Sequence, residues 1–188
     1  MTPHSIVIVR YDPRWPERFA EESARLQAAI GEWAVAIEHV GSTAVPGLGA
    51  KPIVDIGVAL RSFEDALRCI TPLVEQGWVC MGEFGIPGRI FFRKPTDHPE
   101  PGQSPNGVGR THQVHMYEQN HEQFINHLAL REYLRANADA AAEYEALKRR
   151  LADELDDVEA YAEAKTDFIR DVLARARTAG FRVADMHT

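Results

Sequence analysis

Residues 37–56 read IEHVGSTAVPGLGAKPIVDI and combine two β-strand patterns with a glycine-rich loop. The first strand brings His39 to its tip, where Gly41 and Ser42 open the loop. Residues 53–60 have apolar side chains on both faces, which is typical of a strand at the centre of a sheet. Asp55 lies inside this apolar strand, where a carboxylate is costly to bury unless it meets a cation or hydrogen-bond donors. The segment therefore predicts a sheet with a polar site beside its central strand.

The rest of the chain adds strands up to about residue 118 and helices after it. Further strands are expected at 6–9, 35–40, 78–81, 90–93 and 111–117, and helices near 15–30 and 63–74. From residue 121 onward the apolar spacing is helical and predicts three more helices, the last of them carrying Tyr161 and Phe168.

These patterns together predict an α+β fold. We expect a single domain over residues 1–188, with a mixed sheet in 1–118 and a helical portion in 119–180. The polar, Pro- and Gly-rich residues 95–109 are expected to form a long surface loop with an extended or mobile path.

The charge of the chain restricts its partners. A net charge of −7 argues against general nucleic-acid binding, which needs clustered Lys and Arg for phosphate contacts. A small anionic ligand is still compatible, because a local pocket can be basic on an acidic protein. Residues 1–8 have no signal-peptide pattern, and no run approaches the roughly 20 apolar residues of a membrane span. We therefore expect a cytoplasmic protein that binds neither a membrane nor nucleic acid in general.

The loop after His39 has the features of a phosphate site. Glycine at 41 would let backbone N–H groups approach a phosphate closely, and the Ser42 hydroxyl can add a hydrogen bond. Lys51 offers a positive charge, and His39 either supports the loop or reaches the ligand. The P-loop is excluded because Lys51 precedes Pro52 and a strand rather than a helix. The dinucleotide fingerprint is excluded because Gly47-Leu48-Gly49 lacks the third glycine, and the hydrolase nucleophile motif because Ser42 lacks the Gly-x-Ser-x-Gly setting.

Two histidines on a later strand point to different sides. His112 and His115 are three residues apart, so their side chains face opposite sides of the strand and cannot share one metal ion. His115 lies on the same face as Gln113, and we expect it, rather than His112, to line the site. Arg93 shares a strand face with Arg89 and could bind an anionic substrate.

Several motifs taken together resemble the GrpB family. They are HVGSTAVPGL at 39–48, AKPIVDI at 50–56, YDPRWP at 11–16, RTHQVH at 110–115, HLALREYLR at 127–135, and the set Tyr161, Lys165 and Phe168. The resemblance covers nearly the whole chain, and its long first motif is specific.

The GrpB family in turn resembles the nucleotidyltransferase superfamily, which implies a nucleotidyltransferase-like fold. In that superfamily a Gly-Ser pair precedes a strand with two carboxylates that hold magnesium over a nucleoside triphosphate. Here Asp55 is present, but the position two residues on is Gly57. Either one Mg²⁺ at Asp55 suffices, or histidine replaces an acid, or the site binds without transfer.

The resemblance implies roles for the remaining residues. Gly41 and Ser42 would hold phosphates, Asp55 the metal ion, and Lys51 or Lys165 would neutralise developing charge, with His115 as the general base. The function expected is binding of a nucleotide or phosphorylated metabolite, with nucleotidyl transfer as the catalytic form. The alternative is a non-catalytic module for a coenzyme A-related ligand, because family members occur fused to dephospho-coenzyme A kinase.

Overall fold

The computed structural model describes residues 6–96 and 109–182. Within these residues five strands form one sheet in the order β1-β2-β5-β4-β3. Strands β2 and β5 are parallel and all other neighbours are antiparallel, so the sheet is mixed, as the sequence predicts. The strands are β1 (Ala34–Val40), β2 (Val54–Leu60), β3 (Val79–Cys80), β4 (Arg89–Thr96) and β5 (Gly109–Glu118).

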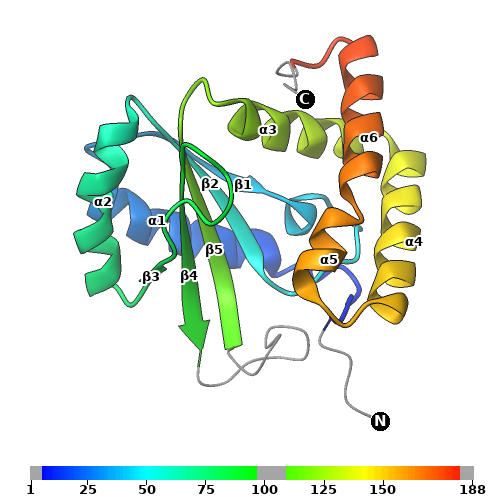
Figure 1. Cartoon of the computed structure of the whole chain (residues 1–188), viewed down its shortest axis with the longest axis horizontal. Coiled ribbons are helices and arrows are strands. Elements are labelled where there is room, and N and C mark those ends of the chain that lie inside the picture. Colours follow the sequence, from blue (N-terminus) through cyan, green and yellow to red (C-terminus); the bar gives the residue numbers. More distant parts are fainter. Residues whose placement is uncertain (1–5, 97–108, 183–188) are drawn as a thin grey trace.

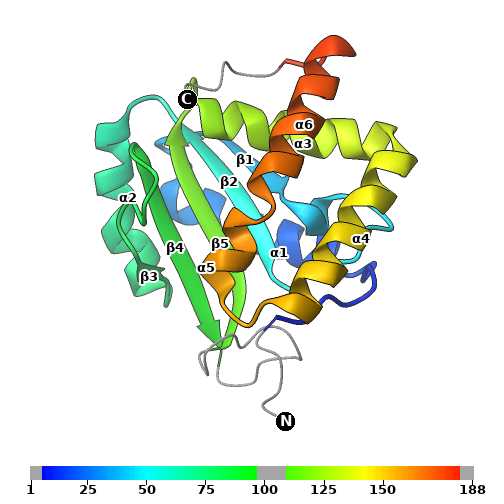
Figure 2. The ribbon, with the colours of Figure 1, turned by 45° about the vertical axis from the view of Figure 1, so that its right-hand side comes forward.

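The helices lie on both faces of the sheet. One face carries α1 (Trp15–Ile30) and α2 (Phe63–Glu75), and α3 (Glu122–Ala136) packs on the other. Beyond α3 come α4 (Ala138–Glu154), α5 (Val158–Glu163) and α6 (Thr166–Thr178). These last three helices gather on the side of the molecule opposite α2 (Figures 1 and 2). A short 3-10 helix, η1 (Ser42–Ala44), follows β1.

Strand β2 explains why the two faces of the sheet differ. Ile56 and Val58 are fully buried in a core cluster with Trp15 of α1 and Leu73 of α2. Because strand side chains alternate, the residues between them, including Asp55, face the other side, toward α3. One face of the sheet is therefore an apolar core, and the other is available for polar chemistry.

Two expected elements differ from the structure. Residues 6–9 form only one bridge, between Val9 and Ala50, because Pro52 just beyond has no N–H with which to extend the pairing. The last expected helix is two helices, α5 and α6, separated by Ala164 and Lys165. Tyr161 of α5 packs against Leu151, whereas Val172 of α6 packs in a different cluster.

Two further expectations concern the surface of the molecule. Most of the expected loop, residues 97–108, lies outside the described residues, and β4 and β5 extend to its edges. Among the residues that are described, no helix has the length and apolar character needed to cross a membrane.

Candidate functional site

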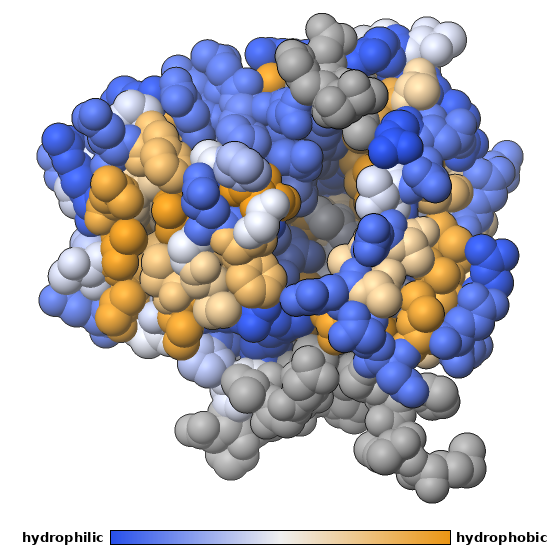
Figure 3. All heavy atoms as spheres, in the orientation of Figure 1, coloured by the Kyte–Doolittle hydropathy of each residue, from blue (hydrophilic) through white to orange (hydrophobic). Residues whose placement is uncertain are grey.

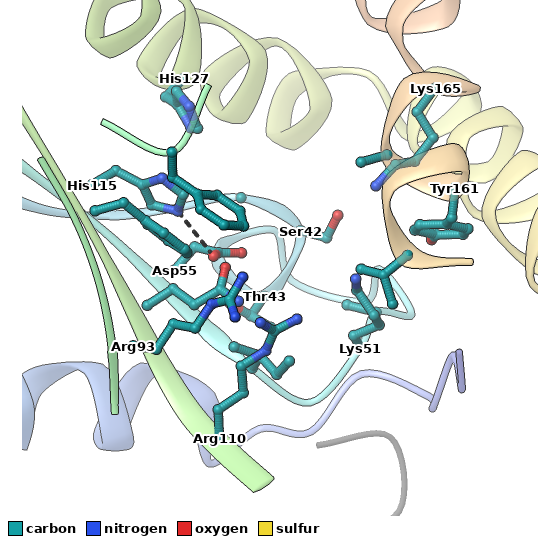
Figure 4. A pocket seen from close by; sticks show the side chains of 18 of the residues that line it. Ser42, Thr43, Lys51, Asp55, Arg93, Arg110, His115, His127, Tyr161 and Lys165 are labelled. Atoms are coloured by element: carbon teal, nitrogen blue, oxygen red, sulfur yellow. Dashed lines mark hydrogen bonds and ion pairs between the residues drawn. The ribbon is translucent and has the colours of Figure 1, made fainter. Parts of the chain in front are cut away.

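A cavity of about 890 Å³ lies between the α3-facing side of the sheet and the C-terminal helices. Figure 3 shows the molecule hollowed between these two parts, and Figure 4 shows the side chains that point into the hollow. The sheet contributes Asp55 from β2, His115 from β5 and Arg93 from β4. Helices α4 and α5 contribute Lys148 and Tyr161. The cavity thus joins residues that are far apart in the sequence.

Asp55 is the centre of a hydrogen-bonded group on the sheet side. Its Oδ1 lies 3.3 Å from Nε2 of His115. In the amide orientation that satisfies both ends of Gln113, this side chain donates to the same oxygen at 3.0 Å and accepts from Nε of Arg110 at 3.1 Å. Burial by itself raises the pKa of Asp55, but the hydrogen bond with His115 and the surrounding positive groups outweigh burial and lower it. Asp55 is therefore an anion at neutral pH.

The turn at Gly41 and Ser42 lies directly against Asp55. Gly41 has a φ of +71°, and a Cβ on it would lie 2.7 Å from Oδ2 of Asp55. Glycine is thus needed both for the left-handed backbone and for the close approach of the carboxylate. The Ser42 hydroxyl points into the cavity (Figure 4), and its hydrogen-bond partner is the hydroxyl of Tyr144. The space that Gly41 leaves is taken by Asp55, and Ser42 is the part of the turn that faces the open cavity.

Two arginines of helix α3 form hydrogen bonds with the backbone next to this turn. Arg131 donates to the carbonyl oxygen of His39 at 2.8 Å, and Arg135 donates to that of Ala44 at 2.9 and 2.7 Å. His39 is only 6% exposed, and its Nε2 lies 3.0 Å from Oγ1 of Thr43. Burial lowers the pKa of His39 to about 4, so its ring is neutral. His39, expected from the sequence at the ligand or behind the loop, therefore lies outside the cavity lining and supports the turn.

Three of the four lysines of the chain meet on the helix side of the cavity. The ammonium groups of Lys51 and Lys165 lie 5.0 and 4.2 Å from the ring centroid of Tyr161. That of Lys148 lies 4.7 Å from the ring centroid of Tyr144. Lys51, Lys148 and Lys165 are called the lysine cluster below.

The lysine cluster has an excess of positive charge. Within the described residues, none of its members forms an ion pair with a carboxylate. Burial lowers the pKa of Lys51 to about 8, and that of Lys148 and Lys165 to about 7. The charges of Lys51 and Lys148 further lower the pKa of Lys165. An anion bound here would reverse these shifts, because it favours the charged form of each lysine.

Two arginines add positive charge on the sheet side. The guanidinium of Arg93 lies 4.7 Å from the ring centroid of Phe84 and 5.4 Å from that of Phe91. Its Nε is buried and has no hydrogen-bond partner in the part of the chain that is described. Arg110 is 8% exposed, and burial together with the charge of Arg93 lowers its pKa to about 10. An anion in the cavity can therefore meet positive groups from both walls.

Gly57 occupies the position where the resemblance expects a second carboxylate. A Cβ at this position would lie 3.2 Å from Cε2 of Phe124 and 3.2 Å from Cγ1 of Val40. Apolar side chains of α3 and β1 thus fill the place that an acid would need. Among the described residues, no three His, Cys, Asp or Glu side chains lie together in a way that could hold a metal ion. A second carboxylate at position 57 would have to displace Phe124 or Val40.

The structure places most of the residues expected at the site around one cavity. Its lining includes Gly41, Ser42, Lys51, Asp55, Arg93, His115 and Lys165. His112 lies on the opposite side of β5 from His115, as the strand period predicts, and its Nδ1 lies 2.8 Å from Oγ1 of Thr111.

Other lining residues were not identified from the sequence. Lys148 belongs to the basic run Lys148-Arg149-Arg150, and such a run is more often solvated, but Lys148 is 2% exposed and donates to the carbonyl oxygen of Gly49. Helical spacing could have indicated that Lys148 is buried, because it lies four residues after Tyr144 and three before Leu151 and so shares their buried face. Arg110 lies within the RTHQVH motif at 110–115, but the sequence pattern assigns it no role.

Comparison with known proteins adds the family. The family model described as GrpB protein matches residues 5–175. The chain belongs to the GrpB family. The protein YqkA of Bacillus subtilis is 36% identical over 173 residues, which cover 92% of this chain and 47% of YqkA. This GrpB-family chain therefore spans about half the length of that relative.

Solved structures agree with the family and with the fold. The crystal structure of the conserved protein GrpB from Enterococcus faecalis is 34% identical, with a TM-score of 0.80, and the match covers 94% of this chain and 100% of that one. Cid1 in complex with the UTP analogue UMPNPP has a TM-score of 0.50 at 19% identity, covering 78% of this chain and 43% of Cid1. This likeness concerns the fold alone, which is nucleotidyltransferase-like.

One further relative has a descriptive name. A dephospho-CoA kinase of Mycolicibacterium paratuberculosis is 30% identical over 186 residues, which cover 90% of this chain and 46% of that protein.

Proposed function

We propose that the cavity of this GrpB-family chain binds a nucleotide or another phosphorylated small molecule. The observation that carries the proposal is the charge of the cavity. Within the described residues, seven lining side chains are Lys or Arg, of which Arg131 is paired with Glu38 and Glu132, and three are Asp or Glu. This surplus occurs in a chain with a net charge of −7, so it is local to the cavity. A phosphorylated ligand is the class of small molecule that such a surplus attracts most strongly.

The lysine cluster and Ser42 are the groups that would hold the phosphates. Lysine presents three donors on a compact charge, and the Ser42 hydroxyl faces the same space (Figure 4). Arg93 and Arg110 reach the ligand from the sheet side. Each hydrogen bond from a charged donor is worth about 1.5–3 kcal/mol, so removing one should weaken binding roughly 10- to 150-fold.

Isothermal titration calorimetry with ATP, dephospho-coenzyme A and inorganic tripolyphosphate tests the proposal. Lys165→Met should weaken binding of every phosphorylated ligand, because it removes a charge but keeps an apolar stem. Arg170→Met is the matched control, since Arg170 lies on α6 outside the lining and pairs with Asp167 at 2.8 Å. If none of the three ligands binds the wild type, or if both variants lose affinity equally, the proposal fails.

Nucleotidyl transfer is the catalytic form of the same proposal. The contact between Asp55 and His115 favours it, because it orients a histidine that could accept a proton from an attacking hydroxyl. Gly57 counts against it, since a second carboxylate there would have to displace Phe124 or Val40. Binding without transfer is therefore the form that we propose first.

Magnesium would meet a limited set of donors at this site. Mg²⁺ binds through one or two carboxylates with phosphate oxygens and water, so Asp55 fits as one protein ligand of an ion that arrives with the phosphates. Such an ion would screen the phosphate charge. Asp55→Asn tests its presence: with EDTA the variant should bind ATP at least as tightly as the wild type, because a negative charge is removed. A loss of affinity that appears only with Mg²⁺ would support the metal ion.

A coenzyme A-related ligand is the alternative. The relative named dephospho-CoA kinase supports it, because a segment similar to this chain makes up 46% of a protein whose name refers to a coenzyme A precursor. In the same titrations, dephospho-coenzyme A binding more tightly than ATP would favour this ligand.

A further inference from the structure

The loop between β3 and β4 holds an aromatic side chain at the cavity in an unusual conformation. Phe84 has a φ of +46°, and among the described residues it is the only non-glycine residue with a positive φ. An aromatic residue adopts this left-handed backbone at an energetic cost that glycine avoids. Phe84 lines the cavity, yet 45% of it is exposed. Strained residues of this kind concentrate at functional sites.

Several hydrogen bonds fix this loop in place. Arg89, only 6% exposed, donates to the carbonyl oxygens of Phe84 at 2.6 Å and of Glu83 at 3.2 Å. The Glu83 carboxylate accepts from the backbone N–H of Gly88 at 2.7 Å. The backbone of Phe84 is therefore held by a buried cation, and its ring is presented toward the cavity in a defined position.

The ring of Phe84 is the first of a row of flat side chains along the cavity wall. It stacks on Phe91 with centroids 5.4 Å apart and an interplanar angle of 28°, and the Arg93 guanidinium lies over it. Phe91 in turn lies 5.0 Å from the ring of His115, which contacts Asp55. Val79, Met81 and Ile86 of the same hairpin also line the cavity. The hairpin wall is thus aromatic and apolar, whereas the facing helices carry the lysine cluster.

We infer that the hairpin wall is a stacking subsite for a flat heteroaromatic ring, with Phe84 as its platform, so that the ligand of the proposed function is a nucleotide. A nucleotide matches both walls, because its base is flat and its phosphates are anionic. A sugar phosphate or free polyphosphate offers no flat face for Phe84. This inference rests on the proposed function and narrows its ligand class.

Calorimetry on Phe84 variants tests the subsite, with ATP and inorganic tripolyphosphate as probes, both in EDTA. Loss of an aromatic side chain on which a base stacks weakens binding roughly 5- to 150-fold, so Phe84→Ala should weaken ATP binding to this extent. The same variant should bind tripolyphosphate as the wild type does, and Phe84→Tyr should keep the ATP affinity. Leu67→Ala is the control, because Leu67 is 57% exposed on α2 and lies outside the cavity lining.

The outcomes separate this inference from the proposed function. If the wild type binds tripolyphosphate as tightly as ATP, or if Phe84→Ala weakens both ligands equally, the stacking subsite is overturned and phosphate binding stands. If neither ligand binds the wild type, both proposals fail. Should Phe84→Ala not fold, Phe84→Trp supplies a fluorescent ring in its place. Its emission should change with ATP and stay constant with tripolyphosphate, and equal responses to both ligands would contradict stacking.

Discussion

Gly57→Ala adds a methyl group to β2 where the structure leaves too little room for one. The new Cβ would lie 3.2 Å from atoms of both Phe124 and Val40, whereas carbon atoms prefer about 3.5–4.0 Å. Val40 is 0% exposed and Phe124 5%, so neither side chain can swing into solvent. Overpacking costs about 1–3 kcal/mol, and the lower entropy of the unfolded alanine chain offsets about 0.4–1 kcal/mol of this. Together these ranges give a net destabilisation of about 0–2.6 kcal/mol, and we expect a value toward the upper end because neither neighbour can move into solvent.

Urea unfolding followed by circular dichroism measures this change. A double-mutant cycle with Phe124→Leu isolates its cause, because leucine removes the ring atom that the new methyl group approaches. Gly57→Ala should then cost less in the Phe124→Leu background, with a coupling energy of about 0.5 kcal/mol or more. Gly57→Asp should be the least stable variant, since it adds a buried carboxylate to the same crowded place, and it should gain no nucleotidyl transfer.

One result would refute the reasoning. If Gly57→Ala is as stable as the wild type, and its effect is the same with Phe124 and with leucine at that position, the crowding argument is wrong. A second carboxylate would then have room on β2, and the case for binding without transfer would lose its main structural support.

Four further predictions concern charge and the turn. Tripolyphosphate affinity should fall as pH rises from 7 to 9.5 in calorimetry, because members of the lysine cluster have pKa values of about 7 to 8 and lose protons there. Over the same range the ligand-free protein should become more stable in urea unfolding, because each lysine binds fewer protons when folded than when unfolded, where its pKa is near the ordinary 10.5. Thr43→Val removes the hydrogen-bond partner of His39 and should lower the free energy of unfolding in urea by about 0.5–1.5 kcal/mol. An unchanged free energy of unfolding would contradict the role of His39 in supporting the turn. Gly41→Ala should lower the melting temperature and weaken ATP binding together, because its Cβ would displace Asp55, and a variant with wild-type values for both would count against that contact.

The sequence predicts the central strand and its turn because the evidence for them is local. Apolar residues on both sides of Asp55 identify a buried strand, and Gly41 and Ser42 precede it within fifteen residues. The alternation of a strand also places His115 and His112 on opposite faces, so that only one of them can line the cavity. These inferences need only the period of one element, so they can be made without knowing how elements pack.

The helix side of the cavity could not be predicted in this way. Lys148 lies close to Gly49, 99 residues earlier, and only the packing of α4 brings them together. Helical spacing predicts that Lys148 shares a face with Tyr144, but it does not identify what that face meets. The break between α5 and α6 is also invisible to apolar spacing, because Tyr161 and Val172 satisfy one period while they pack in two clusters.

The position of the positive charges indicates how this GrpB-family chain would bind an anionic ligand. Burying lysines without carboxylate partners lowers stability, and the chain has 28 acidic residues from which partners could have come. A phosphorylated ligand would remove this penalty by supplying the missing negative charge. On the opposite wall, packing around Gly57 leaves Asp55 without the second carboxylate that paired metal ions need. We therefore infer that lysine and arginine side chains, rather than two metal ions, neutralise the phosphates of its ligand. Replacing a member of the lysine cluster by a neutral residue should then raise the stability of the ligand-free protein and lower its affinity for anions.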